Sequence, residues 1–168
     1  PNSKHSSTFP GIKTICCVSP WLASYSIDMS PCWVLVGSPV EGPTLVTSQI
    51  TLGISLLGIA EFCTDLSDGL ISELDNISEN SELKANIFLK NIPLSKNAKS
   101  EIAKTKDKKK KWEVILTGGE DYKLLFSVKQ NRLNLLKQNN IKNIIKIGYF
   151  SRGNGVDVYD LSEKKINF

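Results

Sequence analysis

The sequence predicts an α+β fold in which a mixed β-sheet carries helices packed on one face. Apolar residues recur at every second position of residues 122–128, a period that is typical of a strand. Leu70, Ile71, Leu74 and Ile77 instead form one apolar stripe with polar residues opposite, which is helical spacing. From about residue 50 onward such strand and helix patterns alternate without any internal repeat.

The composition is that of one globular domain, or of one domain with an appended segment. The 168 residues are 40% apolar and 23% charged, as in ordinary soluble proteins. The net charge of +4 is local, because six lysines lie between residues 104 and 111. Nucleic-acid binders use Arg for bidentate contacts, and only Arg132 and Arg152 are arginines. We therefore expect no nucleic-acid partner and interpret the lysine run as a solvated loop.

Composition divides the chain near residue 48. Residues 1–48 hold six of the seven prolines and only four charged residues, and proline prevents long regular elements. Within them, residues 34–37 favour a short strand. We predict an irregular segment of uncertain fold at residues 1–48, for which translation from a shifted reading frame is one hypothesis. We predict a C-terminal α+β domain, truncated at its own C-terminus, at residues 49–168.

The domain is predicted to alternate helices and strands. The helices are expected at residues 52–60, 70–77, 93–104 and 133–138, and the strands at residues 61–66, 85–89, 122–128, 144–150 and 156–160. Between the last two strands, the pair Asn154 and Gly155 favours a hairpin-like reversal.

Several classes of site lack candidate residues. The only histidine, His5, lies in a polar tract, so Ser-His and Cys-His catalysis have no suitable base. No CxxC pair or zinc-ligand spacing occurs among the cysteines, which are Cys16, Cys17, Cys32 and Cys63. Residues 44–63 lean apolar but are interrupted by polar residues, whereas a membrane helix needs about 20 mostly apolar ones. We expect a cytoplasmic protein with no membrane segment.

The stretch CTDLSDGL, residues 63–70, places two acids three residues apart. An EF-hand loop that began at Asp65 would need Gly at its sixth position and Glu at its twelfth. The sequence has Leu70 and Asn76 there, which excludes this type of calcium site. A strand-to-helix turn, with Ser67 as the N-cap and Asp68 complementing the helix dipole, remains open.

A hard-cation site is the functional alternative for the same turn. Asp65 and Asp68 would project their carboxylates into one cleft, and Mg²⁺ takes one or two protein carboxylates while leaving positions for phosphate oxygens. The Ser67 hydroxyl and the amides at the helix start would donate to a phosphate. Gly69 would let that phosphate approach closely.

A second cluster, TGGEDYKLLF, occupies residues 117–126. One interpretation is a Gly-Gly turn before a strand, with Glu120 and Asp121 exposed. The other is a loop that grips a polar or cationic ligand. Because the sequence contains no Walker A lysine motif, nucleotide binding would have to rely on acids that hold Mg²⁺.

Residues 50–168 resemble the C-terminal domain of thiamine-monophosphate kinases, in the fold group that includes aminoimidazole ribonucleotide synthetase. The resemblance lies in four tracts in this order: ITLGISLLGIAEFCTDLSDGLISEL, KNIPLS, LTGGEDYKLLFSV and IIKIGYFSRGNGVDVYD. SDGL alone is shared with selenophosphate synthetase and the hydrogenase-maturation dehydratase. GGEDY directly before an apolar strand favours the thiamine enzyme.

The resemblance implies phosphoryl transfer from ATP to thiamine monophosphate, which gives thiamine diphosphate and ADP. It implies that Asp65 and Asp68 bind Mg²⁺, that Ser67 contacts ATP and that Glu120 contacts the substrate. It assigns no catalytic residue. It also implies a homodimeric parent protein whose dimer is formed largely by an N-terminal domain that the resemblance does not cover.

Two departures from the family pattern lead us to expect that the isolated chain is inactive. The family's N-terminal domain, which carries further metal and nucleotide contacts, is not matched. An aromatic substrate contact near the family's C-terminus would fall beyond Phe168. Another ATP-using enzyme of the same fold group, similar to selenophosphate synthetase, and a catalytically inert structural fragment stay open as alternatives.

Overall fold

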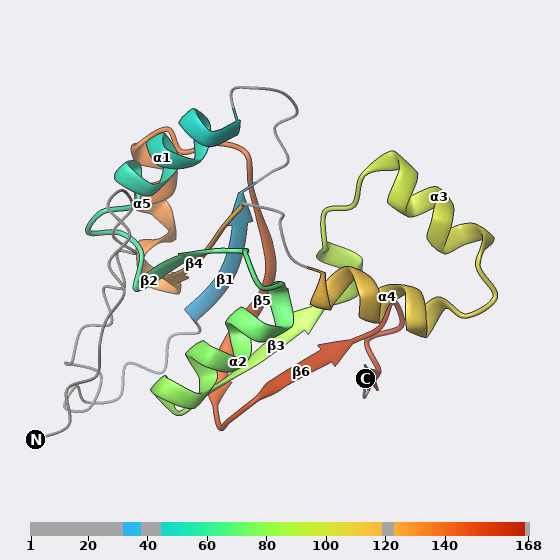
Figure 1. The fold of residues 1–168 in the computed structure, drawn as a ribbon. Coiled ribbons are helices and arrows are strands. Elements are labelled where there is room, and N and C mark those ends of the chain that lie inside the picture. The colour runs from blue at the N-terminus through green and yellow to red at the C-terminus, as the bar shows by residue number, and fades with distance from the viewer. Residues whose placement is uncertain (1–31, 38–44, 119–122, 167–168) are drawn as a thin grey trace, which may run out of the picture.

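The computed structural model describes residues 32–37, 45–118 and 123–166. The strands are β1 (Cys32–Gly37), β2 (Phe62–Asp65), β3 (Leu83–Phe88), β4 (Leu124–Lys129), β5 (Ile144–Arg152), β6 (Val156–Tyr159) and β7 (Lys165–Ile166). The α-helices are α1 (Leu45–Ser55), α2 (Leu70–Ser81), α3 (Lys96–Lys104), α4 (Lys108–Thr117) and α5 (Leu133–Gln138). Figure 1 shows them arranged around one twisted sheet.

The sheet has seven strands in the order β2-β4-β1-β5-β3-β6-β7. Every neighbouring pair is antiparallel except β3 and β6, which run parallel. The prediction of a mixed sheet in an α+β fold is therefore confirmed. The chain reverses direction between β5 and β6, as the pair Asn154 and Gly155 predicted, but the two strands do not pair as a hairpin, because β3 lies between them and pairs with both.

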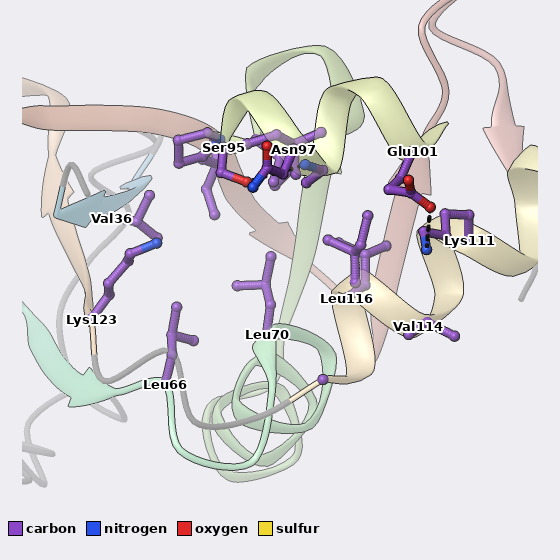
Figure 2. Close-up of a pocket in the computed structure, with 17 residues that line it drawn as sticks. Val36, Leu66, Leu70, Ser95, Asn97, Glu101, Lys111, Val114, Leu116 and Lys123 are labelled. Atoms are coloured by element: carbon purple, nitrogen blue, oxygen red, sulfur yellow. Dashed lines mark hydrogen bonds and ion pairs between the residues drawn. The ribbon is translucent and has the colours of Figure 1, made fainter. Parts of the chain in front are cut away.

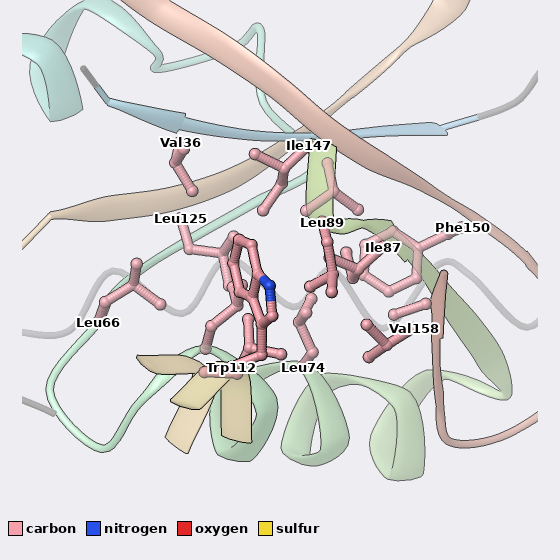
Figure 3. Packing of buried hydrophobic residues seen from close by; sticks show 14 residues of the cluster. Val36, Leu66, Leu74, Ile87, Leu89, Trp112, Leu125, Ile147, Phe150 and Val158 are labelled. Atoms are coloured by element: carbon pink, nitrogen blue, oxygen red, sulfur yellow. The ribbon is translucent and has the colours of Figure 1, made fainter. Parts of the chain in front are cut away.

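Helices cover both faces of the sheet, so the expectation of a single covered face is wrong. On one face, Leu70 and Leu74 of α2 and Trp112 and Leu116 of α4 join the larger core, which Figure 3 shows. On the other face, α1 and α5 pack over a second core of buried residues, which are Leu35, Leu56, Ile59, Phe126, Val128 and Leu136. The physical reason is that neighbours on the central strands, such as Leu125 and Phe126, are both buried and point to opposite faces.

β1 is an interior strand of the sheet, between β4 and β5. The predicted short strand at residues 34–37 is confirmed, and its four residues are buried. The sheet therefore includes a strand from before residue 49, where we placed the start of the α+β domain. The predicted irregular fold of residues 1–31 concerns residues outside the described part of the chain.

The lysine run is partly helical, which corrects its interpretation as a loop. Lys104 ends α3, and α4 begins at Lys108 behind the N-cap Asp107, whose carboxylate accepts a hydrogen bond from the amide of Lys110 at 3.0 Å. Trp112, which follows the run, anchors α4 in the core. None of the helices in the described parts of the chain has the length and apolar character that crossing a membrane requires.

Candidate active site

The two acids of the CTDLSDGL stretch lie where β2 passes into α2. Asp65 is the last residue of β2, and Asp68 lies in the turn that precedes α2. Both side chains are exposed, Ser67 between them is half-buried, and the apolar residues Leu66 and Leu70 are buried beneath the turn. The turn is thus fixed from below by the core while its carboxylates face solvent.

Capping does not explain this turn. α2 begins at Leu70, and its N-cap is Gly69, which contributes no side-chain hydrogen bond. Ser67 lies two residues before the cap, and Asp68 lies before the helix and not in its first turn. The alternative in which Ser67 is the N-cap is therefore wrong, and the carboxylates and the Ser67 hydroxyl are not used to cap α2.

Gly69 joins the acid turn to the end of α4. Its φ of +95° is a conformation that side chains rarely adopt, and a Cβ placed on it would lie 2.7 Å from the carbonyl oxygen of Thr117. Glycine is needed here for contact between two backbone segments. The structure thus gives Gly69 a packing role, and the close phosphate approach that the sequence suggested stays a prediction.

A second backbone contact lies on the other side of the turn. The amide of Leu66 donates to the carbonyl oxygen of Lys123 at 2.8 Å, and Asp65 pairs with Leu124 across β2 and β4. The acid turn therefore contacts the chain on both sides of segment 119–122. Gly69 contacts residues 117 and 118, and Leu66 bonds to Lys123. Glu120 itself, the predicted substrate contact, lies outside the described residues, as does Asp121.

Glu73 is an acidic neighbour that the sequence analysis did not single out. It lies in the first turn of α2, and the Thr64 hydroxyl donates to its carboxylate at 3.4 Å. Partial burial and the nearby charges of Asp65 and Asp68 raise the pKa of Glu73, against the opposing effect of the Thr64 hydrogen bond. The signal that could have identified Glu73 is its position one helical turn after Gly69, on the side of the acids.

The two carboxylates at this turn suit a hard cation whose other coordination positions are filled by water and by oxygens of a bound ligand. Among the described residues, no group of three His, Cys, Asp or Glu side chains is arranged to hold a metal ion by itself. Mg²⁺ commonly uses only one or two protein carboxylates, together with water and phosphate oxygens. The exposed carboxylates of Asp65 and Asp68 fit that role.

A pocket with a cavity volume of about 450 Å³ adjoins the turn. Its floor is apolar and includes Leu66, Leu70, Leu116 and Ile147, while Lys123 stands at one end, as Figure 2 shows for the labelled residues. The two buried residues that support the acid turn thus also line the cavity. This cavity could bury an apolar or aromatic group of a ligand against its apolar floor.

Helices α3 and α4 form the polar rim of this pocket. Ser95 caps α3 by accepting a hydrogen bond from the amide of Ala98 at 3.1 Å, and Asn97 is exposed beside it. Glu101 of α3 forms an ion pair with Lys111 of α4 at 3.7 Å (Figure 2). α3 has no fully buried residue, and its Ile102 packs against the larger core while partly exposed.

Comparison of sequences reveals similarity to thiamine-monophosphate kinases. The chain is 44% identical to that of Haemophilus influenzae over 82 residues, which are 49% of this chain and 24% of the relative. It is 35% identical to that of Buchnera aphidicola subsp. Acyrthosiphon pisum over 128 residues, which are 71% of this chain and 37% of the relative. The chain thus spans well under half of the length of the curated relatives that it matches. No family model matches the chain.

Comparison of structures gives the same group. The structure of AaThiL complexed with AMPPCP and TMP has a TM-score of 0.60 at 23% identity, covering 84% of this chain and 50% of that one. Escherichia coli HypE, a hydrogenase maturation protein, has a TM-score of 0.59 at 14% identity, covering 83% of this chain and 49% of that one. These likenesses confirm the predicted fold. Together with the sequence identities they confirm the predicted resemblance, and the chain is a relative of the thiamine-monophosphate kinases.

Proposed function

We propose that this chain is part of an ATP- and Mg²⁺-dependent kinase that converts thiamine monophosphate to thiamine diphosphate. The single observation that carries the proposal is the junction of the two motifs. Gly69 packs on Thr117, and Leu66 bonds to Lys123, so both described flanks of the GGED segment are held at the acid turn. The names of the sequence relatives and the ligands AMPPCP and TMP of AaThiL support the same activity.

In this proposal the acid turn binds the nucleotide phosphates through Mg²⁺. The carboxylates of Asp65 and Asp68 hold the ion, and the hydroxyl of the half-buried Ser67 donates a hydrogen bond to ATP. When bound, Mg²⁺ neutralises phosphate charge and orients the transferring group. The fixed backbone beneath the turn means that these side chains need little rearrangement when the nucleotide arrives.

The substrate is proposed to lie on the side of the turn where the pocket opens. Its apolar floor would cover the rings of thiamine monophosphate, and Glu120 would contact the substrate from the adjoining segment. A carboxylate suits the positively charged thiazolium ring. Lys123, which lines the same pocket, offers a cation to a phosphate group.

Further parts of the site are proposed to come from outside this chain. The relatives are more than twice as long as the region that they share with it. We infer that the isolated chain is inactive, and that the full-length protein is a cytoplasmic homodimer whose dimer contacts involve that additional region.

The test is a chimera in which residues 32–168, which include β1 and the whole of α1, replace the matching region of the Buchnera aphidicola kinase. The chimera is expected to form thiamine diphosphate from thiamine monophosphate in the presence of ATP and Mg²⁺. Asp68→Asn should lower kcat about 100-fold, since it removes a carboxylate that holds charge in the transition state. Glu79→Gln, which changes an exposed acid on the same helix, should leave kcat unchanged.

Two results would contradict the proposal. One is a chimera that is folded, as judged by a cooperative thermal transition, yet forms no thiamine diphosphate. The other is equal activity of Asp68→Asn and Glu79→Gln. A separate titration of the 168-residue chain with Mg²⁺ and ATP reports on the turn alone, and Asp68→Asn should weaken that binding.

A further inference from the structure

Helix α1 and the turn after it carry apolar side chains on two opposite sides. One side, which includes Leu52 and Leu56, packs into the second core. The other side presents Ile50, Ile54 and Leu57, which are 55%, 63% and 58% exposed. Their spacing of four and three residues places them in one row. We call these three residues the α1 stripe.

The segment that contains the α1 stripe carries no charged residue. Residues 44–60 contain no Asp, Glu, Lys or Arg. A helix at a protein surface normally carries charged or polar residues on its outer side, whereas a helix that is apolar all round is a buried one. α1 is not apolar all round, since Thr51 and Ser55 are exposed beside the stripe, but its outer side carries no charged residue. An uncharged outer side with a row of three exposed aliphatic residues suits a helix that a second layer covers.

The size of the stripe argues against a second copy of this chain as the missing layer. A stable interface buries roughly 800 Å² on each partner. Three aliphatic side chains that are little more than half exposed provide far less apolar area. A segment of the same polypeptide needs less area, because its linkage replaces most of the entropy cost of association.

The length of the relatives identifies such a segment. AaThiL shares only 50% of its chain with this protein, although 84% of this protein is covered. We propose that the α1 stripe is the surface on which an apolar element of the additional chain of the full-length kinase packs. The inference rests on the relation in fold to these kinases and does not depend on the proposed activity.

Cysteine labelling in the chain and in the chimera tests the proposal. Ile54→Cys and, as a matched control, Leu161→Cys place a thiol at positions that are 63% and 65% exposed, on α1 and in the turn after β6. The rate of alkylation at each position is read by peptide mass spectrometry. Burial and the charge of Asp65 raise the pKa of the native Cys63 thiol to about 11, so that thiol reacts slowly.

Both introduced thiols should react at similar rates in the 168-residue chain. In the chimera, position 54 should react at least tenfold more slowly, while position 161 is unchanged. Leu57→Cys should repeat the result if Ile54→Cys disturbs the fold. Equal labelling of positions 54 and 57 in both proteins would overturn the proposal.

Sedimentation of the 168-residue chain separates a second copy from the proposed segment. The chain should remain monomeric, and a dimer that Ile54→Lys abolishes would also overturn the proposal. The labelling can also be measured in the Asp68→Asn chimera, in which kcat should be about 100-fold lower. Loss of the proposed activity and loss of protection at position 54 are therefore separate results.

Discussion

Gly69 links the two motifs because a side chain at this position would occupy the space of the Thr117 carbonyl group. The positive φ and the 2.7 Å approach are two independent reasons for glycine. The glycine of the acid turn thus sets the position of the turn relative to the end of α4. The carboxylates on either side of Ser67 are positioned by this contact and by the buried Leu66 and Leu70.

Gly69→Ala is expected to destabilise the chain by more than the cost of a positive φ alone, which is about 1–3 kcal/mol. Gly58→Ala is the matched control, since Gly58 also has a positive φ of 73° but nothing within 4 Å of an added Cβ. Urea denaturation of the two variants measures the difference. Equal losses of unfolding free energy would show that the contact with Thr117 does not constrain the turn.

Asp157 on β6 makes stability depend on pH. Its carboxylate lies 2.8 Å from the ammonium group of Lys165 and 3.5 Å from that of Lys84. The hydrogen bond from Lys165 and the charges of both lysines lower the pKa of Asp157 below its ordinary value of 3.8, against an opposing effect of burial. A lowered native pKa stabilises the fold above pH 3.8, and this stabilisation is lost as the pH falls through the lowered value.

Asp157→Asn is therefore expected to lower the free energy of unfolding at pH 7 by about 0.2–1 kcal/mol. The difference from the unchanged chain should shrink below pH 4 and in high salt, because both conditions weaken the ion pairs. Denaturation at pH 7 and pH 3 measures it. A loss of the same size at both pH values would mean that charge is not the cause, and Glu79→Gln controls for removal of an exposed acid.

Helix α3 forms one wall of the pocket although it buries none of its side chains fully. Its position depends on the Ser95 cap, the apolar residues that precede it and the ion pair of Glu101 with Lys111. Surface ion pairs contribute little, typically about 0–1 kcal/mol. The rim of the pocket is therefore the part of the site most easily altered by substitution.

Asn97→Trp is expected to fill the pocket entrance and raise the KM of the chimera for thiamine monophosphate, with little change in kcat. Lys99→Trp is the matched control, because Lys99 is exposed on the same helix and does not line the pocket. Steady-state kinetics with varied thiamine monophosphate measures both. An unchanged KM for Asn97→Trp would mean that the substrate does not use this pocket.

Helix α4 shows why a charge run can hide a helix. Four consecutive lysines at residues 108–111 suggested a loop, since neighbouring like charges repel and no apolar period is visible among them. The helix is instead set by the N-cap Asp107 and by Trp112 and Leu116, which are one turn apart and buried in the core. The apolar spacing that predicts this helix, Trp112 followed by Leu116, comes after the lysines in the sequence.

Across the whole molecule, the sheet is assembled from segments far apart in the sequence. β1 pairs with β4 and β5, and β3 enters between β5 and β6. Strand patterns predicted that most of these strands exist, because a period of two is a local property. Which strands are neighbours depends on long-range packing, so the local turn signal predicted the reversal between β5 and β6 but not that β3 would lie between them.

The sequence by itself determined the α+β class, the positions of most elements and the two motifs that carry the resemblance. It did so because periodicity and turn chemistry are encoded within a few residues. Only the tertiary structure decided that helices cover both faces, that Gly69 contacts Thr117, and that Glu73 lies near the acids. These features depend on which distant segments share a surface, and burial of the two core faces selects that arrangement.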